Sequence, residues 1–207
     1  MEAIRRRRSI RRFKQTPLTK KQIETLVEAA RLAPSGSNVQ PWRFIIAIDE
    51  EIRKGILDAS FGQRCIGEAP VFLVCCGDLL SWKKARENTQ EILDLLDVPI
   101  NKKYREALMN RVDNAVREEM HKRIPTTMMN VAIAIEHIVL EAVKLGLGTC
   151  WVRIFDEKKV RCLFDLPEHF YIVALLPIGV PDEDPEPRPR LPLSMITLPI
   201  SRETSKK

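Results

Sequence analysis

Three segments of the chain carry polar groups whose types and spacing could bind a phosphate and a planar ring. The first is the basic run Arg7-Arg8-Ser9-Ile10-Arg11-Arg12-Phe13. Arginine offers a fork of donors that matches phosphate oxygens, and Ser9 adds a hydroxyl donor. Arg7 and Arg11 are four residues apart, so we expect them to share a face if the run forms a helical turn. The run predicts an anion site, with a solvated basic turn as the ordinary alternative.

The second segment is a loop rich in turn-forming residues, Pro34-Ser35-Gly36-Ser37-Asn38-Val39-Gln40-Pro41-Trp42. A loop of this composition exposes backbone N–H groups and short side chains. Asn38 and Gln40 can each donate and accept hydrogen bonds, which suits the edge of a heterocycle. Trp42 can pack against a planar ring. Taken alone, the loop is more often only a turn.

The third segment is Pro187-Arg188-Pro189-Arg190-Leu191-Pro192-Leu193, near the other end of the chain. In an extended chain, residues two apart point the same way, so Arg188 and Arg190 would present two guanidinium groups to one side. An Arg-Pro-Arg stretch alone is usually a solvated tail. Together with the N-terminal run, however, it could supply a second arginine pair to a single phosphate.

Together these residues resemble the nitroreductase family of flavin mononucleotide (FMN) enzymes. That family opens with R-x-S-x-R/K-x-F and continues, after a helix, with P-S-x-x-N-x-Q-P-W-x-F. It closes with a basic pair before Leu-Pro. All three patterns are present here, and Ala69-Pro70 and the Gly146-to-Trp151 stretch are weaker matches. The resemblance spans nearly the whole chain.

The resemblance implies an α+β fold, in which helices flank a central, mainly antiparallel sheet. It also implies an intertwined homodimer with two FMN sites at its interface. The chain would then be one nitroreductase-like domain over residues 1–207, whose proline-rich tail, 180–207, extends over the partner subunit. The apolar helix expected over residues 128–145 would pack at the dimer centre.

The site residues that the resemblance implies fall into three groups. The FMN phosphate would be held by Arg7, Ser9, Arg188 and Arg190, with Arg8 nearby. Arg11 would approach the N1/C2=O edge of the flavin, where a cation stabilises the reduced form, and Arg64 is a candidate for a second cation there. The other subunit would supply Pro34, Ser35, Gly36 and Asn38, and Gln40 belongs to the same motif. Leu147, Gly148 and Thr149 would touch the ring through backbone groups.

The activity that the resemblance implies is electron transfer from NAD(P)H through FMN to an electron-poor acceptor, such as a nitroaromatic or a quinone, in a ping-pong cycle. No side chain need act as acid or base, so no catalytic residue is assigned. Relatives on the same fold remove halogens reductively or break down the flavin, and these chemistries stay open. Residues 80–125 would form the lid that sets specificity, where Phe61, Trp82 and Tyr104 could line the site.

Two classes of protein other than enzymes compete with this interpretation. A flavin-binding protein for storage or sensing would bind FMN without turnover. A nucleic-acid-binding protein would use the arginine run. Against the latter, aromatic residues make up only 6% of the chain, and no zinc, helix-turn-helix or RNA-binding signature is present. We therefore expect no nucleic-acid partner.

Composition places the chain among ordinary folded proteins. It has 207 residues, of which 44% are hydrophobic and 30% charged, and a net charge of +6. No apolar run reaches the roughly 18 residues of a membrane span, and the basic start has no apolar core typical of a secretory signal. The five cysteines form no CxxC, and with the three histidines they make no zinc pattern. These features favour a cytoplasmic protein without a metal site or a membrane association.

Helices and strands alternate in the sequence pattern. Thr19 and Gln22 form a capping box that starts a helix over residues 19–33, and Asp49 could cap another through about residue 59. The remaining helices are expected over residues 128–145, after a break at Pro125 and Thr126, and over 156–164. Strands are expected at 44–48, 71–76, 149–154 and 171–178. Seven of the 14 prolines lie in residues 177–199, so no helix is expected in the tail.

Overall fold

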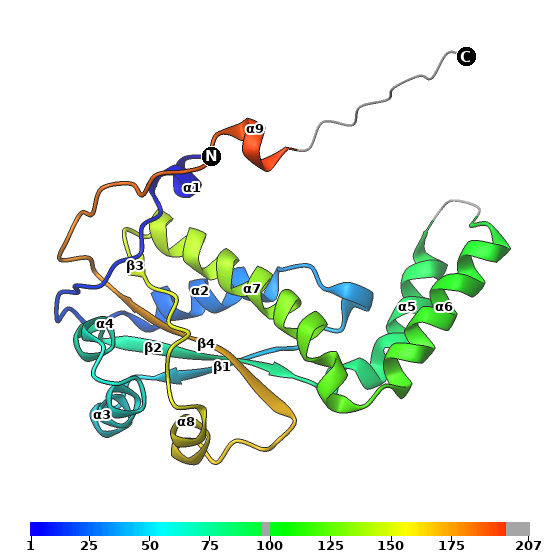
Figure 1. Ribbon diagram of the computed structural model, residues 1–207, viewed down its shortest axis with the longest axis horizontal. Coiled ribbons are helices and arrows are strands. Elements are labelled where there is room, and N and C mark those ends of the chain that lie inside the picture. The colour runs from blue at the N-terminus through cyan, green and yellow to red at the C-terminus, as the bar shows by residue number, and fades with distance from the viewer. Residues whose placement is uncertain (97–99, 198–207) are drawn as a thin grey trace.

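The computed structural model describes residues 1–96 and 100–197, and within them one antiparallel sheet forms the centre (Figure 1). The strands are β1 (Trp42–Ala47), β2 (Val71–Asp78), β3 (Gly148–Thr149) and β4 (Phe170–Gly179), in the spatial order β1-β2-β4-β3. Each neighbouring pair is antiparallel. Since helices cover both faces, the α+β architecture expected from the sequence is confirmed.

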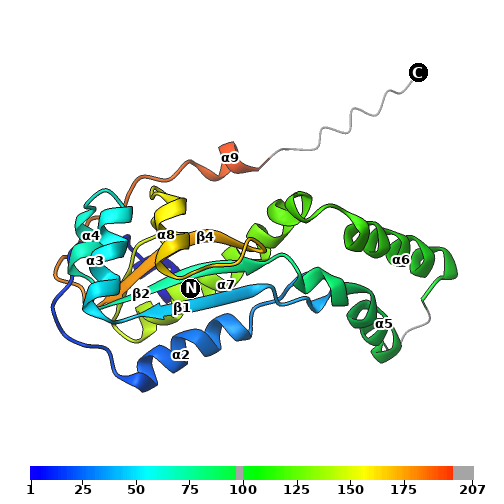
Figure 2. The same ribbon diagram turned by 90° about the horizontal axis from the view of Figure 1, so that it is seen from below.

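Two groups of helices bury the two faces of the sheet (Figure 2). One face packs against α2 (Lys20–Arg31) and α7 (Ile124–Lys144), and the other against α3 (Glu50–Ala59), α4 (Arg64–Glu68) and α8 (Glu157–Leu163). The alternation along β2 produces this division, because successive side chains of a strand point to opposite faces. Leu73 and Cys75 lie in the α2/α7 cluster, whereas Phe72, Val74 and Cys76 lie in the other.

Local signals in the sequence fix several helix ends. Thr19 caps α2, and both hydrogen bonds of the capping box with Gln22 are present. The Asp49 carboxylate accepts from the first turn of α3, as expected. Gly146 ends α7 with φ +72°, a left-handed conformation that glycine adopts without steric cost.

Three expectations about the elements are wrong. Pro125 does not break a helix, because it lies in the first turn of α7, where its missing N–H is not needed. Residues 149–154 do not form a full strand. Their pairing with β4 is interrupted where Pro177 lacks an N–H group and resumes only as a bridge from Val152 to Leu175. The tail forms one helical turn, α9 (Leu193–Ile196).

The segment expected to form a lid is a helical hairpin of α5 (Ala85–Leu95) and α6 (Lys102–Arg117), which projects from the end of the sheet (Figure 1). Short turns η2 (Ser81–Lys84) and η3 (Met120–Arg123) join it to the core. The buried Arg123 guanidinium donates to the carbonyls of Leu79, Val116 and Glu118, so it fastens the base of the hairpin. Trp82 is buried there, and Tyr104 is exposed on α6. Phe61 follows α3, and Figure 1 shows α3 at the other end of the molecule from the hairpin.

The N-terminal segment lies near the C-terminal end of α7, and residues 185–190 of the tail lie close to that segment. The short helix α1 (Glu2–Arg6) packs on α7, and the tail passes beside it (Figure 1). By length and composition alone, the stretch Met120–Lys144 could cross a membrane. In the fold, its buried residues pack against α2 and the sheet.

Candidate functional site

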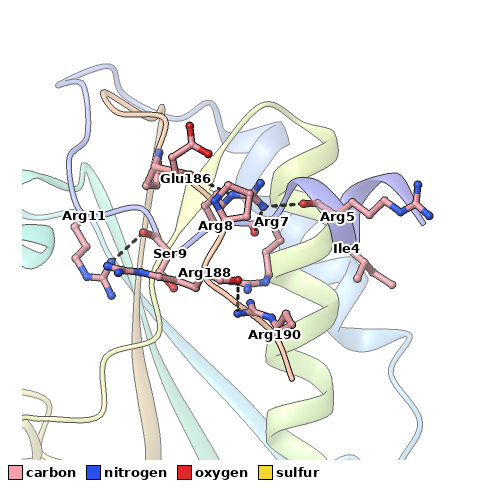
Figure 3. A pocket seen from close by; sticks show the side chains of 11 residues that line it. Ile4, Arg5, Arg7, Arg8, Ser9, Arg11, Glu186, Arg188 and Arg190 are labelled. Carbon is pink, nitrogen blue, oxygen red and sulfur yellow. Dashed lines mark hydrogen bonds between the residues drawn. The ribbon is translucent and has the colours of Figure 1, made fainter. Parts of the chain in front are cut away.

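Arginines from the two ends of the chain surround one cavity of about 370 Å³, which we call the arginine cavity. It is lined by Ile4, Arg5, Arg7, Arg8, Ser9, Arg11, Pro185, Glu186, Pro187, Arg188 and Arg190. Figure 3 shows Arg7, Arg8, Ser9 and Arg188 around it, whereas the Arg5 side chain points away. The convergence of the N-terminal run and the tail, expected from the sequence, is present within a single chain.

The guanidinium groups of this cavity form no ion pair with a carboxylate within 4 Å among the described residues. Two neighbouring arginines that do pair with a carboxylate lie outside the cavity lining. Arg6 pairs with Glu2 at 3.2 Å, and Arg12 pairs with Asp182 at 3.9 Å. The cavity guanidiniums instead donate to main-chain carbonyls, as Arg8 does to Pro185 at 3.2 Å. Because the lining holds five guanidiniums besides that of Arg5 and only one carboxylate, Glu186, the cavity favours an anion with several acceptor oxygens.

The N-terminal run is extended, not helical, so the reason given above for Arg7 and Arg11 sharing a face is wrong. Helix α1 ends at Arg6, and Arg7 has φ −55° and ψ 129°. Beyond it the chain pairs with two segments in turn: Ser9 with Thr149 in parallel, and Phe13 with Pro181 in antiparallel. In an extended chain alternate side chains share a side. The two residues share the cavity for that reason.

Leu147, Gly148 and Thr149 line a second cavity of about 480 Å³, here called the β3 cavity. Arg8 lines both cavities, so the N-terminal run separates them. A Cβ on Gly148 would lie 2.6 Å from the Ile10 side chain, and the Ile10 N–H donates to the Thr149 carbonyl at 2.9 Å. The close approach of Gly148 therefore lets the N-terminal run lie against β3.

The loop of residues 34–40 is held in a compact conformation by its own polar groups and by its neighbours. The Ser35 hydroxyl accepts from the Gln40 N–H at 3.0 Å, and the Gln40 amide donates to Asn38 Oδ1 at 3.1 Å. Buried Asn130 of α7 accepts from the Gly36 N–H at 3.3 Å. Asn88 of α5 donates to the Asn38 carbonyl at 3.0 Å. The α5/α6 hairpin and α7 thus both hold this loop in place.

Three non-glycine residues of the loop have positive φ: Ser37 at 50°, Asn38 at 47° and Gln40 at 44°. Such conformations cost energy for residues other than glycine, and clusters of them are found at binding sites. The alternate residues Pro34, Gly36, Asn38 and Gln40 are exposed. The loop therefore presents a preformed surface to solvent.

This loop and the arginine cavity lie at opposite ends of α7. Gly36 bonds to Asn130 near the start of that helix, and Val143 near its end lines the β3 cavity. Thirteen residues of α-helix separate these positions, a rise of about 20 Å. Neither the arginine cavity nor the β3 cavity is lined by any residue of the loop. Within one chain, the loop is therefore separate from both cavities.

Sequence reasoning missed two carboxylates that hold the N-terminal run. Glu183 accepts from the N–H groups of both Arg11 and Arg12, and Glu68 accepts from the Phe13 N–H at 3.1 Å. Glu183 lies in Asp182-Glu183-Asp184, an acidic stretch opposite the basic run, and this was the available signal. Arg64, expected near the ring, pairs instead with Glu68 and does not line the arginine cavity.

Charges near Arg11 act on a buried thiol pair. A hydrogen bond with Cys65 and, less strongly, the Arg11 cation lower the pKa of Cys150 to about 7, against burial and the Glu183 carboxylate, which raise it. The same bond and burial raise the pKa of Cys65. Arg11 and Glu183 therefore have opposite electrostatic effects on the pKa of the Cys150 thiol.

Comparison with known proteins places this chain in a family. The family model described as nitroreductase matches residues 4–180. An NADH dehydrogenase of Thermus thermophilus is 32% identical over 193 residues, covering 93% of this chain and 92% of that protein. A 5,6-dimethylbenzimidazole synthase of Rhodospirillum rubrum is 30% identical, covering 89% and 82%. A structure from Exiguobacterium sibiricum, solved in complex with FMN, shares the fold at TM-score 0.78 and 22% identity, covering 95% of each chain.

The chain therefore belongs to the nitroreductase family, as its motifs indicated. Members of this family are FMN-dependent and use NAD(P)H, so the protein is an NAD(P)H-dependent FMN oxidoreductase. The residues present fit the cofactor. The arginine cavity offers guanidinium forks and the Ser9 hydroxyl, the donors that a phosphate dianion requires, and no carboxylate neutralises those forks within the described residues.

Proposed function

We propose that the protein passes electrons from NAD(P)H to an electron-poor organic acceptor, such as a nitroaromatic or a quinone, in a ping-pong cycle. The observation that supports this most strongly is the arginine cavity, built from opposite ends of the chain beside β3. When bound, FMN would accept a hydride from the nicotinamide and deliver electrons to the acceptor. The protein's part is to bind, orient and set the electrostatic field.

The residues of the arginine cavity would hold the phosphate of the cofactor. Arg7 and Ser9 come from the N-terminal run and Arg188 and Arg190 from the tail, with Arg8 at the edge. Guanidinium forks bind phosphate oxygens in pairs, which fixes orientation as well as affinity. Arg11, at the end of the row, would place a cation at the ring edge and favour the reduced cofactor electrostatically.

A second copy of the chain would complete the site. The loop 34–40 is preformed and partly exposed, yet it contacts α7 about 20 Å along the helix from Val143, which lines the β3 cavity next to the arginine cavity. In a twofold dimer, the loop of one copy could face the cavity of the other, since each copy carries both the loop and the cavity. Pro34, Ser35, Gly36, Asn38 and Gln40 would then contact the ring across the interface. Leu147, Gly148 and Thr149 would contact it from the β3 side.

Exposed apolar side chains support this assembly. The tail leaves Leu191, Leu193, Met195 and Ile196 between 61% and 76% exposed, and Met129 on α7 is 56% exposed. Burying such side chains is favourable in proportion to their area. We propose that they pack on a partner copy and that the protein acts in the cytoplasm, where its five free cysteines would stay reduced.

Two other functions compete. A storage or sensing protein would bind FMN without turnover. A relative with different flavin chemistry, as the similarity to a 5,6-dimethylbenzimidazole synthase allows, would turn over FMN itself or use another substrate, such as a halogenated aromatic. Neither has a feature in the described residues that favours it over electron transfer.

Steady-state kinetics test the proposal. Initial rates of NADH and NADPH oxidation are measured against a quinone and a nitroaromatic at several fixed concentrations of each. A ping-pong cycle gives parallel double-reciprocal lines. Intersecting double-reciprocal lines would contradict the ping-pong cycle. Flavin that is reduced but never reoxidised by any acceptor would point to storage or sensing.

A further inference from the structure

The N-terminal run changes its pairing partner in the middle of the site. Residues 8–10 pair with β3, where Ile10 donates to the Thr149 carbonyl at 2.9 Å. Residues 12–14 pair with the start of the tail, where Lys14 donates to Val180 at 2.9 Å and Arg12 accepts from Asp182 at 3.0 Å. Between these two pairings, which we call the crossover, the N–H groups of Arg11 and Arg12 have no main-chain acceptor on either neighbouring segment.

Glu183 supplies the acceptor that the crossover lacks. One oxygen of its carboxylate accepts from the Arg11 N–H, and the same oxygen accepts from the Arg12 N–H at 3.2 Å. Charge-assisted hydrogen bonds of this kind are about twice as strong as neutral ones. Glu183 is half-buried and lines the β3 cavity. It therefore lies between the segment that pairs with β3 and the segment that pairs with the start of the tail.

Two consequences follow for the neighbouring side chains. Since the backbone at Arg11 is fixed, the alternate residues Arg7, Ser9 and Arg11 keep their common direction into the arginine cavity. The carboxylate also places one negative charge at the main chain of Arg11, although it forms no ion pair with the Arg11 guanidinium within 4 Å.

We propose that Glu183 is a positioning residue for the cofactor, which fixes the backbone at Arg11 and Arg12 and offsets part of the positive charge at the ring edge. This inference rests on the proposed placement of FMN. A carboxylate near the ring disfavours the extra electrons of the reduced cofactor, so Glu183 would hold the midpoint potential below the value that the arginines alone would set.

Two variants separate position from charge. Glu183→Gln keeps a carbonyl oxygen that can accept from both N–H groups but removes the charge. Glu183→Ala removes both. Glu168→Gln is the charge-matched control, because Glu168 is exposed in the turn before β4 and forms no ion pair or side-chain hydrogen bond within the described residues.

Each holoprotein is titrated for FMN dissociation and, separately, for midpoint potential, with chemical unfolding as a check on folding. Loss of the acceptor in Glu183→Ala should weaken FMN binding about tenfold, the typical effect of one charged hydrogen bond. Glu183→Gln should bind FMN as tightly as the unmodified protein, with a higher midpoint potential. Glu168→Gln should change neither.

Two results would overturn the inference. Unchanged FMN binding in Glu183→Ala would remove the positioning role. A potential in Glu183→Gln equal to that of Glu168→Gln would remove the electrostatic role, and this comparison stands even if Glu183→Ala fails to fold. Failure of the proposed function is distinguishable, because the unmodified protein would then bind no FMN or resist reduction.

Discussion

At the scale of single residues, the site is defined by which charges are left unpaired. Residues 5–12 contain six arginines. Arg6 and Arg12 are neutralised by nearby carboxylates, whereas Arg7, Arg8 and Arg11 face a cavity. The run alone does not distinguish these two sets. The extended backbone separates Arg7 and Arg11 from Arg12, because residues 7, 9 and 11 point to one side of it, and Arg8 lines both the arginine cavity and the β3 cavity.

Arg188→Ala tests the phosphate role of this cavity. A lost hydrogen bond to a charged group costs about 1.5–3 kcal/mol, so FMN affinity should fall roughly ten- to hundredfold. Riboflavin, which lacks the phosphate, should bind the variant and the unmodified protein alike. Arg31→Ala is the control, because Arg31 pairs with Glu28 on α2, away from the cavity. An equal loss for FMN and riboflavin would show that Arg188 does not contact the phosphate.

At the scale of elements, the N-terminal run acts as a strand that joins β3 to the start of the tail. Two of its contacts need a particular neighbour: Ile10 lies where only a glycine at position 148 leaves room, and the Phe13 N–H needs the Glu68 carboxylate. The placement of the site therefore depends on residues that do not touch the arginine cavity.

Gly148→Ala should displace the run and weaken both stability and FMN binding. The added methyl group would lie 2.6 Å from Ile10, and overpacking of this kind costs about 1–3 kcal/mol. Gly67→Ala is the matched control. Gly67 lies in α4, where alanine favours the helix. Its added Cβ would lie at an ordinary 3.7 Å from Leu57 of α3. Chemical unfolding with FMN titration measures both effects, and Gly148→Ala behaving like Gly67→Ala would contradict the packing described here.

The Glu68 carboxylate should make stability depend on acid pH. A hydrogen bond from Arg64, then one from the Phe13 N–H, lowers the pKa of Glu68 below its ordinary 4.5. A lowered folded-state pKa adds stability above the unfolded-state pKa, and this is lost as pH falls through the folded value. The stability difference between the unmodified protein and Glu68→Gln should therefore be constant near neutral pH and shrink below about pH 4.5. Unfolding curves at pH 7 and pH 3.5 test this, and a difference that does not shrink would refute it.

The elements that could be predicted from the sequence are those fixed by local chemistry. Thr19, Asp49 and Gly146 mark helix ends through short-range bonds and backbone freedom, and β2 follows from its apolar run. The strand at 149–154 could not be predicted, because its length depends on Pro177 of a distant strand. The arginine pairs could be named, but Glu68 and Glu183 act through contacts between segments 55 and 172 residues apart.

At the scale of the whole molecule, the two regions that we propose to bind the cofactor lie apart within one chain. The loop 34–40 contacts α7 at Asn130, about 20 Å along the helix from Val143, which lines the β3 cavity next to the arginine cavity. Apolar side chains on the tail and on α7 are left uncovered. A twofold dimer would account for both features. It would cover the apolar side chains and bring the loop of one copy to the arginine cavity of the other.

Complementation between two defective chains tests this arrangement. One chain carries Arg188→Ala with Arg190→Ala, and the other carries Asn38→Asp. Each homodimer should lose most activity, whereas a mixed dimer has one intact site and one doubly altered site. Random mixing should therefore restore about a quarter of the unmodified sites. Activity of the mixture is measured after coexpression, and an absence of recovery would show that each site lies within one chain.

The central claim is that this fold holds FMN in the arginine cavity for reduction by NAD(P)H. Its most direct test is an absorption spectrum of the purified protein, recorded anaerobically before and after addition of NADH or NADPH. Flavin bands that bleach on addition, and that are absent from Arg7→Ala with Arg188→Ala, are the expected result. A colourless protein that takes up no added FMN, or flavin bands that persist with both nucleotides, would contradict the claim.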